Sequence, residues 1–341
     1  MTKRLNESLI QVLNRLETIY RGKNQFKSRA YKKAAETIMT IGEDITDIAV
    51  LKDAPNIGKS IFDKLTEYVQ TGTIKLTDAE FEIKSVNVEE WSSGPEAILA
   101  NVYGIGPKKA KQLVGMGITT IEQLRAKQDE VLNPVQKIGL QYYEDILQRI
   151  PRAEIERYSK LFKSVIQNIN RRAANKGHIL RGEIVGSYRR GAADSGDIDM
   201  ILTCTNEGMY GQFIDDLIKR NIIIKVLSRG SSKCLVIGRI GEGSVARRID
   251  FLFSSAEEYP FSILYFTGSK TFNTVMREHA LKKGFTMNEH RIKLKTCEPI
   301  NTHDGCFVTH KFESEQDIFA FLGLQYIKPA ERINGSQIIP I

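Results

Sequence analysis

The hydrophobic pattern of this 341-residue chain changes near residue 180, and the change limits the folds that the chain can adopt. Before that point apolar residues recur at intervals of three and four, which predicts helices over 5–20, 28–39 and 60–70 and a helix pair from 108–116 to about 148. After it, short apolar runs predict strands at 184–186, 198–202, 222–227, 233–240 and 247–253, then a helix near 270–283. Helices followed by a mixed sheet predict separate domains, the first α and the second α+β.

Composition favours a globular protein inside the cell. No apolar run approaches the roughly 18 residues that a membrane span needs, and the charged N-terminus lacks the apolar stretch of a signal peptide. The cysteines show neither zinc-site nor disulfide spacing; they are Cys204, Cys234, Cys297 and Cys306. These patterns predict a soluble intracellular protein with free thiols.

Basic residues exceed acidic ones, 49 to 41, and the formal net charge of +8 favours polyanionic partners. The excess is concentrated between Arg21 and Lys33, where six residues are basic and none is acidic. Such a patch can release counterions from phosphates. On charge alone, a solvated helix face explains the patch equally well.

Two short turns precede predicted helices, and the second repeats the pattern of the first. They are Pro55-Asn56-Ile57-Gly58 and Gly104-Ile105-Gly106-Pro107, each followed by lysines, and each resembles a helix-hairpin-helix turn. Backbone N–H groups in such a turn can contact a DNA phosphate, and Gly58, Gly104 and Gly106 would permit that close approach. Asn56 stands at a glycine position, and asparagine tolerates left-handed backbone geometry well. The alternative is a pair of structural turns between helices.

A Gly-Ser turn at Gly186-Ser187 is followed closely by two aspartates, Asp197 and Asp199. On a strand their side chains would point to the same face, because side chains alternate. Two neighbouring carboxylates raise each other's pKa unless a cation lies between them. Magnesium prefers oxygen ligands and bridges carboxylates to substrate phosphates, so the pattern predicts a magnesium site.

A third carboxylate is expected on a neighbouring strand, and Asp250 supplies it among apolar residues. An unpaired carboxylate within a strand is costly unless something compensates it. Metal ligation is therefore favoured over a surface aspartate that faces an arginine. The guanidinium of Arg190 suits triphosphate oxygens beside this triad.

Several long, ordered motifs resemble those of the family X DNA polymerases. They are Gly186–Asp199, Asp250, Tyr265-Phe266-Thr267-Gly268-Ser269 and the stretch from Phe272 to Phe285. The likeness runs nearly end to end and includes both turns and Arg149-Ile150-Pro151. It implies a helical lyase-type domain with helix-hairpin-helix turns, then polymerase thumb, palm and fingers with a nucleotidyltransferase palm sheet. Because the helical unit opens the sequence, we expect the compact beta type to be closer than the longer lambda or terminal-transferase types.

The resemblance also divides the chain into four parts. Residues 1–80 would form the helical 5′-deoxyribose phosphate lyase-type domain with the first turn, and 95–150 a helical DNA-binding subdomain with the second. Residues 151–260 would form the catalytic palm, and 261–341 the C-terminal subdomain that binds the nascent base pair. Residues 80–97, which contain Trp91-Ser92-Ser93-Gly94-Pro95, would be a linker.

By resemblance, Asp197 and Asp199 bind two magnesium ions, which Mn²⁺ can replace, and Asp250 binds the catalytic ion and helps to deprotonate the primer 3′-OH. In such two-metal chemistry one ion activates the hydroxyl and the other neutralises the triphosphate. The implied triphosphate contacts are Arg149, Ser187, Arg190, Ser195 and Gly196. Tyr265, Phe266 and Gly268 would line the sugar, although core packing is the alternative for the two aromatic residues. Asn273 would contact the incoming base and Arg277 the template.

The N-terminal unit resembles the lyase domain, in which a lysine forms a Schiff base with an abasic sugar. Lys64 aligns with that nucleophile, and Lys27, Tyr31 and Lys52 align with supporting DNA-binding residues; an exposed helix lysine is the alternative for Lys64. A monovalent cation at the helix-hairpin-helix turns is also implied. Two residues depart from the family: Phe26 replaces a histidine, and Ser60 replaces a phosphate-binding lysine. The lyase pocket is therefore expected to be altered.

The palm departs from the family at Leu252, two residues after Asp250, where the beta type has an arginine that takes part in domain closure. Glu289 retains the position of that arginine's partner. We expect closure to use a different ion-pair switch, one that involves Arg248.

The function expected is therefore DNA-templated gap filling in base excision repair, with lyase activity as a second function. The expected partners are gapped or nicked DNA and dNTPs, the expected state is a monomer, and the location is the nucleus if the source is eukaryotic. A template-independent terminal transferase is an alternative, disfavoured because Ser228–Ser232 leaves little room between two strands for a template-replacing loop. A non-catalytic DNA-binding scaffold is the other alternative, although all three carboxylates are present.

Overall fold

The computed structural model describes residues 5–21, 24–41, 45–76, 85–87, 94–173, 177–206, 208–295, 308, 310–333 and 335–341. The chain divides into two compact units, Met1–Val131 with Asn334–Ser336 and Leu132–Ile333 with Gln337–Ile341. The division falls inside the 95–150 segment, so the four domain boundaries stay predictions. Trp91, Ser92, Ser93, Cys297 and Cys306 lie outside the described residues. In the part of the chain that is described, no helix is long and apolar enough to cross a membrane.

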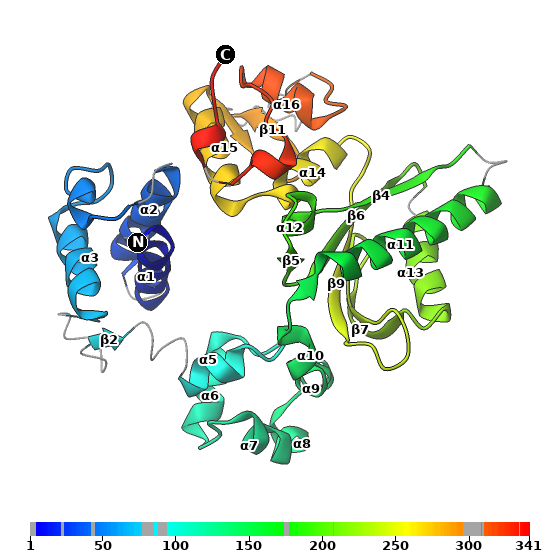
Figure 1. The fold of residues 1–341 in the computed structure, drawn as a ribbon, viewed down its shortest axis with the longest axis horizontal. Helices are drawn as coiled ribbons and strands as arrows, with labels where there is room; N and C mark the ends of the chain where they lie inside the picture. Colours follow the sequence, from blue (N-terminus) through cyan, green and yellow to red (C-terminus); the bar gives the residue numbers. More distant parts are fainter. Residues whose placement is uncertain are drawn as a thin grey trace, which may run out of the picture. The chain divides into compact units, whose positions relative to one another are not determined.

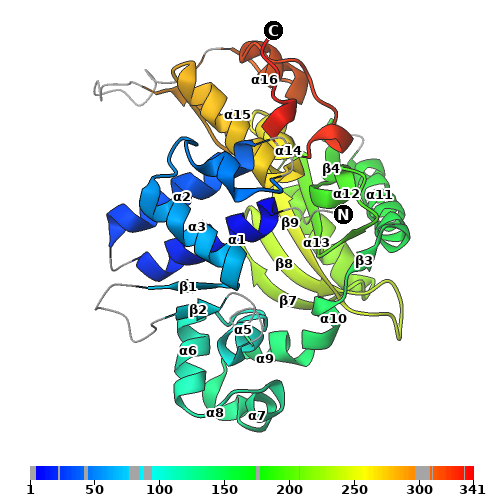
Figure 2. The ribbon, with the colours of Figure 1, turned by 60° about the vertical axis from the view of Figure 1, so that its left-hand side comes forward.

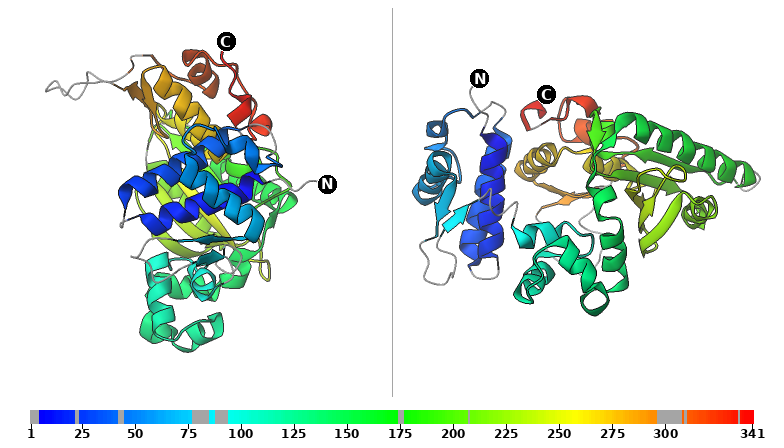
Figure 3. Two further views of the ribbon diagram at one scale, coloured as in Figure 1. Left: turned by 90° about the vertical axis from the view of Figure 1, so that its left-hand side faces the viewer. Right: turned by 60° about the horizontal axis from the view of Figure 1, so that its bottom comes forward.

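Three helices form the core of the first unit: α1 (Asn6–Tyr20), α2 (Gln25–Thr40) and α3 (Lys59–Thr71). Figure 3 shows α1 and α2 side by side, and their apolar faces bury Leu13, Ile38 and, from α3, Leu65. Between α2 and α3 a 3-10 turn, η1 (Ile48–Leu51), leads into the first predicted hairpin turn. The helices expected at 5–20, 28–39 and 60–70 are therefore confirmed.

The first unit is not all-helical, which corrects the expectation of a purely helical first domain. Strand β1 (Thr73–Lys75) follows α3 and pairs antiparallel with β2 (Ser85–Asn87), which comes from the expected linker. That stretch also contributes the start of α5 (Pro95–Ala100). A three-residue strand carries too weak a pattern to be recognised in isolation, because its partner provides the hydrogen bonds that define it.

The helix pair expected up to about residue 148 is a series of five short helices. Gly117, at a φ of 80°, and the side-chain caps Thr120 and Asn133 interrupt the helical backbone. The helices are α6 (Pro107–Gly115), α7 (Ile121–Ala126), α8 (Gln128–Val131), α9 (Pro134–Gln141) and α10 (Tyr143–Leu147).

A five-stranded sheet organises the second unit (Figure 2), in the order β4-β6-β9-β8-β7. Its strands are β4 (Leu180–Ile184), β6 (Ile198–Cys204), β7 (Ile223–Arg229), β8 (Lys233–Gly238) and β9 (Arg247–Phe253). β6 and β9 are parallel, whereas the other neighbours are antiparallel. The strand expected at 184–186 ends at Ile184, because Gly186 adopts a φ of 64° and begins helix α12 (Gly186–Arg189). The other four predicted strands are confirmed within two residues.

Two helices, α11 (Arg152–Ala173) and α13 (Gly208–Lys219), cover one face of this sheet (Figure 1). Phe162 of α11 and Phe213 of α13 place their ring centroids 5.4 and 5.5 Å from that of Phe251 on β9. Met200 of β6 belongs to the same core. Because side chains alternate along a strand, Asp199 points to the opposite face.

The opposite face meets helix α14 (Tyr259–Thr267), whose Ile263 packs with Val185 and Ile201. The chain continues through α15 (Lys270–Lys282), a hairpin of β10 (Phe285–Met287) and β11 (Ile292–Leu294), and α16 (Glu315–Phe321). Two 3-10 turns follow, η3 (Pro329–Glu331) and η4 (Gly335–Gln337). The helix expected at 270–283 is confirmed.

Gly238 closes β8 where the backbone of Ile222 approaches. A Cβ added there would lie 2.8 Å from the carbonyl oxygen of Ile222 and 2.8 Å from Cδ1 of Ile249, and a backbone atom cannot turn aside. We expect Gly238→Ala to lower the free energy of unfolding in urea by about 1–3 kcal/mol through overpacking. Gly241→Ala is the control, since its nearest atom would be 3.8 Å away. Equal stability of the two variants would contradict the close approach.

Candidate active site

Two of the predicted aspartates face each other across the parallel strand pair. The register of β6 against β9 sets Asp199 opposite Asp250, with Ile198 opposite Ile249 and Met200 opposite Phe251. Both carboxylates therefore lie on the face opposite the core under α11 and α13. Asp199 is half-buried, and its Oδ2 would lie 3.3 Å from a Cβ at position 186, so the turn at Gly186 passes close to it.

Burial makes this carboxylate pair costly in its charged form. The pKa of Asp199 is raised to about 6, first by burial and then by the charge of Asp250, while Lys233 of β8 lowers it. Burial also raises the pKa of Asp250, against the opposing effects of Arg248 and Lys233. Oδ1 of Asp250 is buried and accepts no hydrogen bond within the described structure. A positive charge between the carboxylates would offset these costs.

Asp197 is placed differently from the prediction. It stands in a bend before β6 begins at Ile198, rather than on the strand with Asp199. Its carboxylate forms an ion pair with Arg248, whose Nε also lies 3.5 Å from Oδ1 of Asp250. The guanidinium of Arg248 therefore contacts both Asp197 and Asp250. The sequence pattern had predicted that the three carboxylates would lie together, without this arginine between them.

A divalent cation fits Asp199 and Asp250 better than it fits the full triad. The orphaned, buried Oδ1 of Asp250 and the raised pKa of Asp199 are features that an oxygen-binding cation would relieve. Among the described residues, however, no group of three or more His, Cys, Asp or Glu side chains is arranged to hold a metal ion. Asp197 would have to exchange Arg248 for the metal, so its ligation stays a prediction.

A short strand pair brings together three of the predicted triphosphate residues. β3 (Ile150–Pro151) pairs antiparallel with β5 (Asp194–Ser195), with Ile150 opposite Ser195. Arg149 Nε donates to Oδ1 of Asp194 at 2.9 Å, and a Cβ at Gly196 would lie 3.3 Å from its Nη1. Asp194 is an orienting partner that the sequence did not single out.

The other predicted triphosphate residues adjoin this pair. The hydroxyl oxygens of Ser187 and Ser195 lie 2.7 Å apart. Arg190 donates from Nη1 to the carbonyl oxygen of Thr267 at 2.6 Å, and a Cβ at Gly268 would meet the same Nη1 at 3.2 Å. Burial lowers the pKa of Arg190. Serine hydroxyls and two guanidinium groups, beside a glycine at positive φ, make a surface suited to phosphate oxygens.

The predicted sugar and base residues form a second linked set on α14 and α15. Asn273 Nδ2 donates to the carbonyl oxygen of Tyr265 at 2.6 Å, and the Arg277 guanidinium carbon lies 5.1 Å from the centre of the Tyr265 ring. The rings of Tyr265 and Phe266 pack edge to face, with their centroids 5.1 Å apart. Both rings are half-buried rather than enclosed in the core, so they remain available to a ligand.

Leu252 lines a pocket of about 530 Å³ together with Phe266, Lys233 and Glu289. Its side chain packs against the cluster of Val185, Ile201 and Ile263 and can form no ion pair. Glu289 pairs with Arg277 rather than with residue 252, and its Oε2 lies 3.6 Å from Nη2 of Arg277. The ion pair of Arg248 with Asp197 agrees with an altered switch, although a role in closure stays a prediction.

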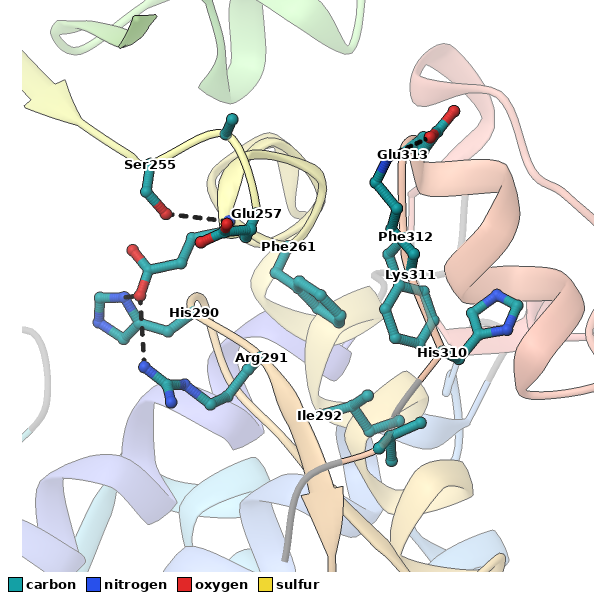
Figure 4. Close-up of a pocket in the computed structure, with 13 residues that line it drawn as sticks. Ser255, Glu257, Phe261, His290, Arg291, Ile292, His310, Lys311, Phe312 and Glu313 are labelled. Atoms are coloured by element: carbon teal, nitrogen blue, oxygen red, sulfur yellow. Dashed lines mark hydrogen bonds and ion pairs between the residues drawn. The ribbon is translucent and has the colours of Figure 1, made fainter. Parts of the chain in front are cut away.

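A separate pocket of about 550 Å³ lies between the start of α14 and the segment before α16 (Figure 4). Phe261, Ile292 and Phe312 line it between two polar groups, His290 with Arg291 and Lys311 with Glu313. None of the predicted site residues lines this pocket. It therefore has no part in the site built around Asp199 and Asp250.

The predicted lyase residues all lie in the first unit. Lys64 of α3 donates from Nζ to the carbonyl oxygen of Lys75 at 3.2 Å. Lys27 Nζ lies 5.1 Å from the centre of the Tyr20 ring, which is 5.4 Å from the ring of Tyr31. Lys52 is exposed and caps η1, and Phe26 is 85% exposed at the start of α2. Lys27 and Tyr31 thus form one aromatic-cationic group, whereas Lys64 is anchored near β1.

The two hairpin turns have the backbone geometry expected of them. Asn56 adopts a φ of 61° and Gly104 a φ of 84°, so the left-handed positions are confirmed. Gly58 and Gly106 have negative φ and cap α3 and α6, and a Cβ on either would meet nothing within 4 Å. Glycine is a common N-cap residue, and the open space beside each one leaves room for the close approach of another group.

Sequence patterns missed the charged contacts that join distant segments. Arg189 donates to Oε2 of Glu315 at 2.8 Å, and the fully buried Arg332 donates to Oε1 of the same carboxylate at 2.6 Å. These residues tie α12 to α16 and to the chain's last turns. Local patterns carry no signal for such a network, because its hydrogen-bonded partners Arg189 and Glu315 are 126 residues apart.

Four family models match the chain in succession. They are a helix-hairpin-helix domain at 4–74, the fingers domain of DNA polymerase lambda at 97–147, the DNA polymerase beta palm at 149–256 and the DNA polymerase beta thumb at 262–333. The palm model spans the sheet that carries Asp199 and Asp250.

Named proteins match along almost the whole chain. It is 28% identical over 345 residues to DNA polymerase lambda of Arabidopsis thaliana and 26% identical over 340 residues to DNA polymerase lambda of Rattus norvegicus. DNA nucleotidylexotransferase of Xenopus laevis is 26% identical over 350 residues. These matches cover 96%, 95% and 91% of the chain but only 62%, 56% and 64% of the relatives. A nearer relation to the compact beta type stays a prediction.

Arg248 contacts the carboxylates of Asp197 and Asp250, so it would compete with a cation that bound them. We expect Arg248→Gln to bind Mn²⁺ about two- to fivefold more tightly, since a partly exposed ion pair is worth about 0.2–1 kcal/mol. Electron paramagnetic resonance of Mn²⁺, without DNA or nucleotide, measures this. Arg172→Gln is the control, because it removes the same charge from a pair with Asp216 outside the site. Unchanged or weaker binding by Arg248→Gln would refute the competition.

Proposed function

The chain belongs to the family X DNA polymerases, and from that premise we propose that it is a DNA-directed DNA polymerase that fills short gaps during base excision repair. Its substrates would be gapped or nicked double-stranded DNA and dNTPs, and it would act as a monomer. Nuclear location, for a eukaryotic source, belongs to the same proposal.

One observation carries the proposal: Asp199 and Asp250 face each other across β6 and β9, next to a cationic, hydroxyl-rich group formed around Arg149, Arg190 and Gly186. A buried carboxylate pair beside donors for phosphate oxygens is an arrangement suited to phosphoryl transfer. The proposal therefore rests on geometry as well as on the family.

The reaction would transfer a nucleotidyl group to a primer. The primer 3′-oxygen attacks the α-phosphorus of the dNTP, the bond from that phosphorus to the bridging oxygen breaks, and pyrophosphate leaves. Oδ1 of Asp250, which accepts no other hydrogen bond, would take the hydroxyl proton. Arg149 and Arg190 would hold the triphosphate, with the hydroxyls of Ser187 and Ser195 between them.

Members of this family generally need divalent metal ions. We propose two magnesium ions, replaceable by manganese, held by Asp199 and Asp250 and, once Arg248 has moved, by Asp197. Bound there, the ions would supply activation of the hydroxyl and neutralisation of charge on the triphosphate.

The ribose, base and DNA contacts are proposed for the residues already placed. Tyr265, Phe266 and Gly268 would line the sugar, Asn273 the incoming base and Arg277 the template. Gly58, Gly104 and Gly106 would let backbone amides reach DNA phosphates, with a monovalent cation at each turn. The open space beside Gly58 and Gly106 supports this proposal.

Terminal transfer without a template is the weaker reading, although one relative is a DNA nucleotidylexotransferase. β7 ends at Arg229 and β8 begins at Lys233, so only Gly230–Ser232 connect them. A loop that replaces the template has no room in that connection. A DNA-binding scaffold without catalysis is also disfavoured. Burying the charges of Asp199 and Asp250 costs free energy, and DNA binding at the hairpin turns would give no reason to keep both carboxylates.

The gap-filling activity depends on Asp250. We expect Asp250→Ala to slow incorporation of one dNTP into a one-nucleotide gap with a 5′-phosphate by about 10²–10⁴-fold, because the proton acceptor and a metal ligand are both lost. Single-turnover extension with magnesium measures this. Asp215→Ala serves as the control, because it also removes a carboxylate that faces an arginine. Asp215 lies on α13 and pairs with Arg229 of β7, outside the proposed site. An inactive wild type, or full activity in Asp250→Ala, would overturn the proposal.

A second activity, removal of 5′-deoxyribose phosphate, is proposed for the first unit. Lys64 Nζ would attack the sugar aldehyde, and the adduct would lose water to form an imine. Loss of a C2′ proton would then break the C3′–O bond and release the strand with its 5′-phosphate, and water would hydrolyse the imine to free Lys64. The group formed by Lys27, Tyr20 and Tyr31, with Lys52 as a further cation, would bind the DNA end. Phe26 and Ser60 distinguish this pocket from that of the family.

The lyase proposal predicts a covalent product at Lys64. Borohydride should trap the imine on a pre-incised abasic-site DNA, and trapping by Lys64→Ala should fall about 10²-fold or more, because the nucleophile is gone. Lys75→Ala is the matched control, a lysine whose backbone carbonyl adjoins Lys64 Nζ. Trapping that survives in Lys64→Ala would assign the nucleophile elsewhere.

A further inference from the structure

Arg247 is a buried arginine that stands three residues before Asp250, at the first position of β9. Its guanidinium donates two hydrogen bonds to the carboxylate of Glu154, from Nε to Oε1 at 2.8 Å and from Nη2 to Oε2 at 2.7 Å. Its side chain is 5% exposed. This fork-shaped pairing fixes the orientation of the guanidinium and leaves Nη1 to point elsewhere.

The remaining nitrogen, Nη1, is directed at two backbone carbonyls. It donates to the oxygen of Gln148 at 3.1 Å and to that of Arg149 at 3.5 Å. Both carbonyls belong to the short segment between α10, which ends at Leu147, and β3, which begins at Ile150. Arg247 therefore holds the backbone at the residue whose side chain belongs to the proposed triphosphate group.

The consequence lies in how Arg149 is oriented. Its side chain reaches Asp194 and passes Gly196, while β3 and β5 hold the following residue, Ile150, opposite Ser195. β5 does not pair with the five-stranded sheet. The contacts of Arg247 therefore provide a direct link from the strand that carries Asp250 to the backbone of Arg149.

We propose that Arg247 is a positioning residue for nucleotide binding, which sets Arg149 at the triphosphate by holding its backbone against β9. This rests on the proposed function, in which Arg149 contacts the triphosphate. Lysine cannot replace Arg247, because an ammonium lacks the planar fork that engages both oxygens of Glu154 and the carbonyls together.

A neighbouring contact provides the matched control. Oδ2 of Asp145 in α10 accepts a hydrogen bond from the backbone N–H of Ala246 at 2.9 Å. It ties the same connecting segment to the same end of β9 but touches neither carbonyl. Asp145→Ala removes a comparable contact without releasing Arg149, so a general loosening of this junction would affect Asp145→Ala and the Arg247 variant alike.

The experiment measures the equilibrium Kd of the correct dNTP, with magnesium and one-nucleotide-gapped DNA whose primer ends in a dideoxynucleotide, so that no chemistry is needed. Arg247→Lys should raise Kd about tenfold, or about 1.4 kcal/mol. Glu154→Gln, a milder change that keeps Arg247, should raise it about threefold, and Asp145→Ala should leave it within about twofold. Thermal unfolding of each variant reports folding separately, and Glu154→Gln carries the test if Arg247→Lys does not fold.

A double-mutant cycle identifies the route of the effect. In an Arg149→Ala background the rise caused by Arg247→Lys, or by Glu154→Gln, should disappear, because the residue being positioned is absent. A rise of the same size in that background would overturn the proposal, as would a wild-type Kd in the Arg247 and Glu154 variants or an equal rise in Asp145→Ala. A merely structural role predicts lower stability with additive effects.

Failure of the proposed function gives a different result. If wild type binds the dNTP but does not extend an ordinary primer, polymerase activity is refuted while the Kd values still decide the role of Arg247. If wild type binds no dNTP, both proposals are overturned.

Discussion

The parallel pairing of β6 with β9 is the constraint on which the site depends, because it sets Asp199 opposite Asp250 on a partly buried face. Two carboxylates so placed destabilise the fold unless positive charge lies nearby, and the raised pKa of Asp199 reflects that cost. Lys233 and Arg248 supply part of the compensation. The pairing thereby sets two carboxylates where a cation would offset the cost of their burial.

In the second unit, arginine side chains connect segments that are far apart in the sequence. Arg149 joins β3 to β5, Arg247 joins β9 to α11, and Arg189 joins α12 to α16. Each uses several nitrogens of one planar guanidinium, a fork that lysine lacks. Arg149 holds Asp194 through its carboxylate and its backbone carbonyl, whereas Arg247 and Arg189 hold partners from different segments. The mostly buried pairs of Arg247 and Arg189 add little net stability over apolar packing but specify geometry, whereas the pair of Arg149 with Asp194 is exposed. The proposed triphosphate residue Arg149 is aligned both by this network and by the short pairing of β3 with β5.

The first unit follows a different rule, because its features are local. Asn56 and Gly104 adopt left-handed backbone conformations within turns, and the following helices begin at Gly58 and Gly106. Lys27 lies over an aromatic ring one helix away. These groups need only a hairpin and a three-helix core to be displayed. Departures from the family, such as the exposed Phe26, can therefore occur without disturbing the fold.

The sequence by itself determined what short-range physics controls: β9 at 247–253, the helix near 270–283 and the left-handed Asn56. It also picked out the three aspartates as candidates, whose chemical role stays a prediction. Only the tertiary structure decided that Asp197 precedes β6 and forms an ion pair with Arg248. It also decided that β1 pairs with β2 and that Arg247 donates hydrogen bonds to Glu154. Periodicity reports which face a side chain occupies. It cannot report which distant segment will supply its partner, because ion pairs and strand registers are set only once the chain has packed.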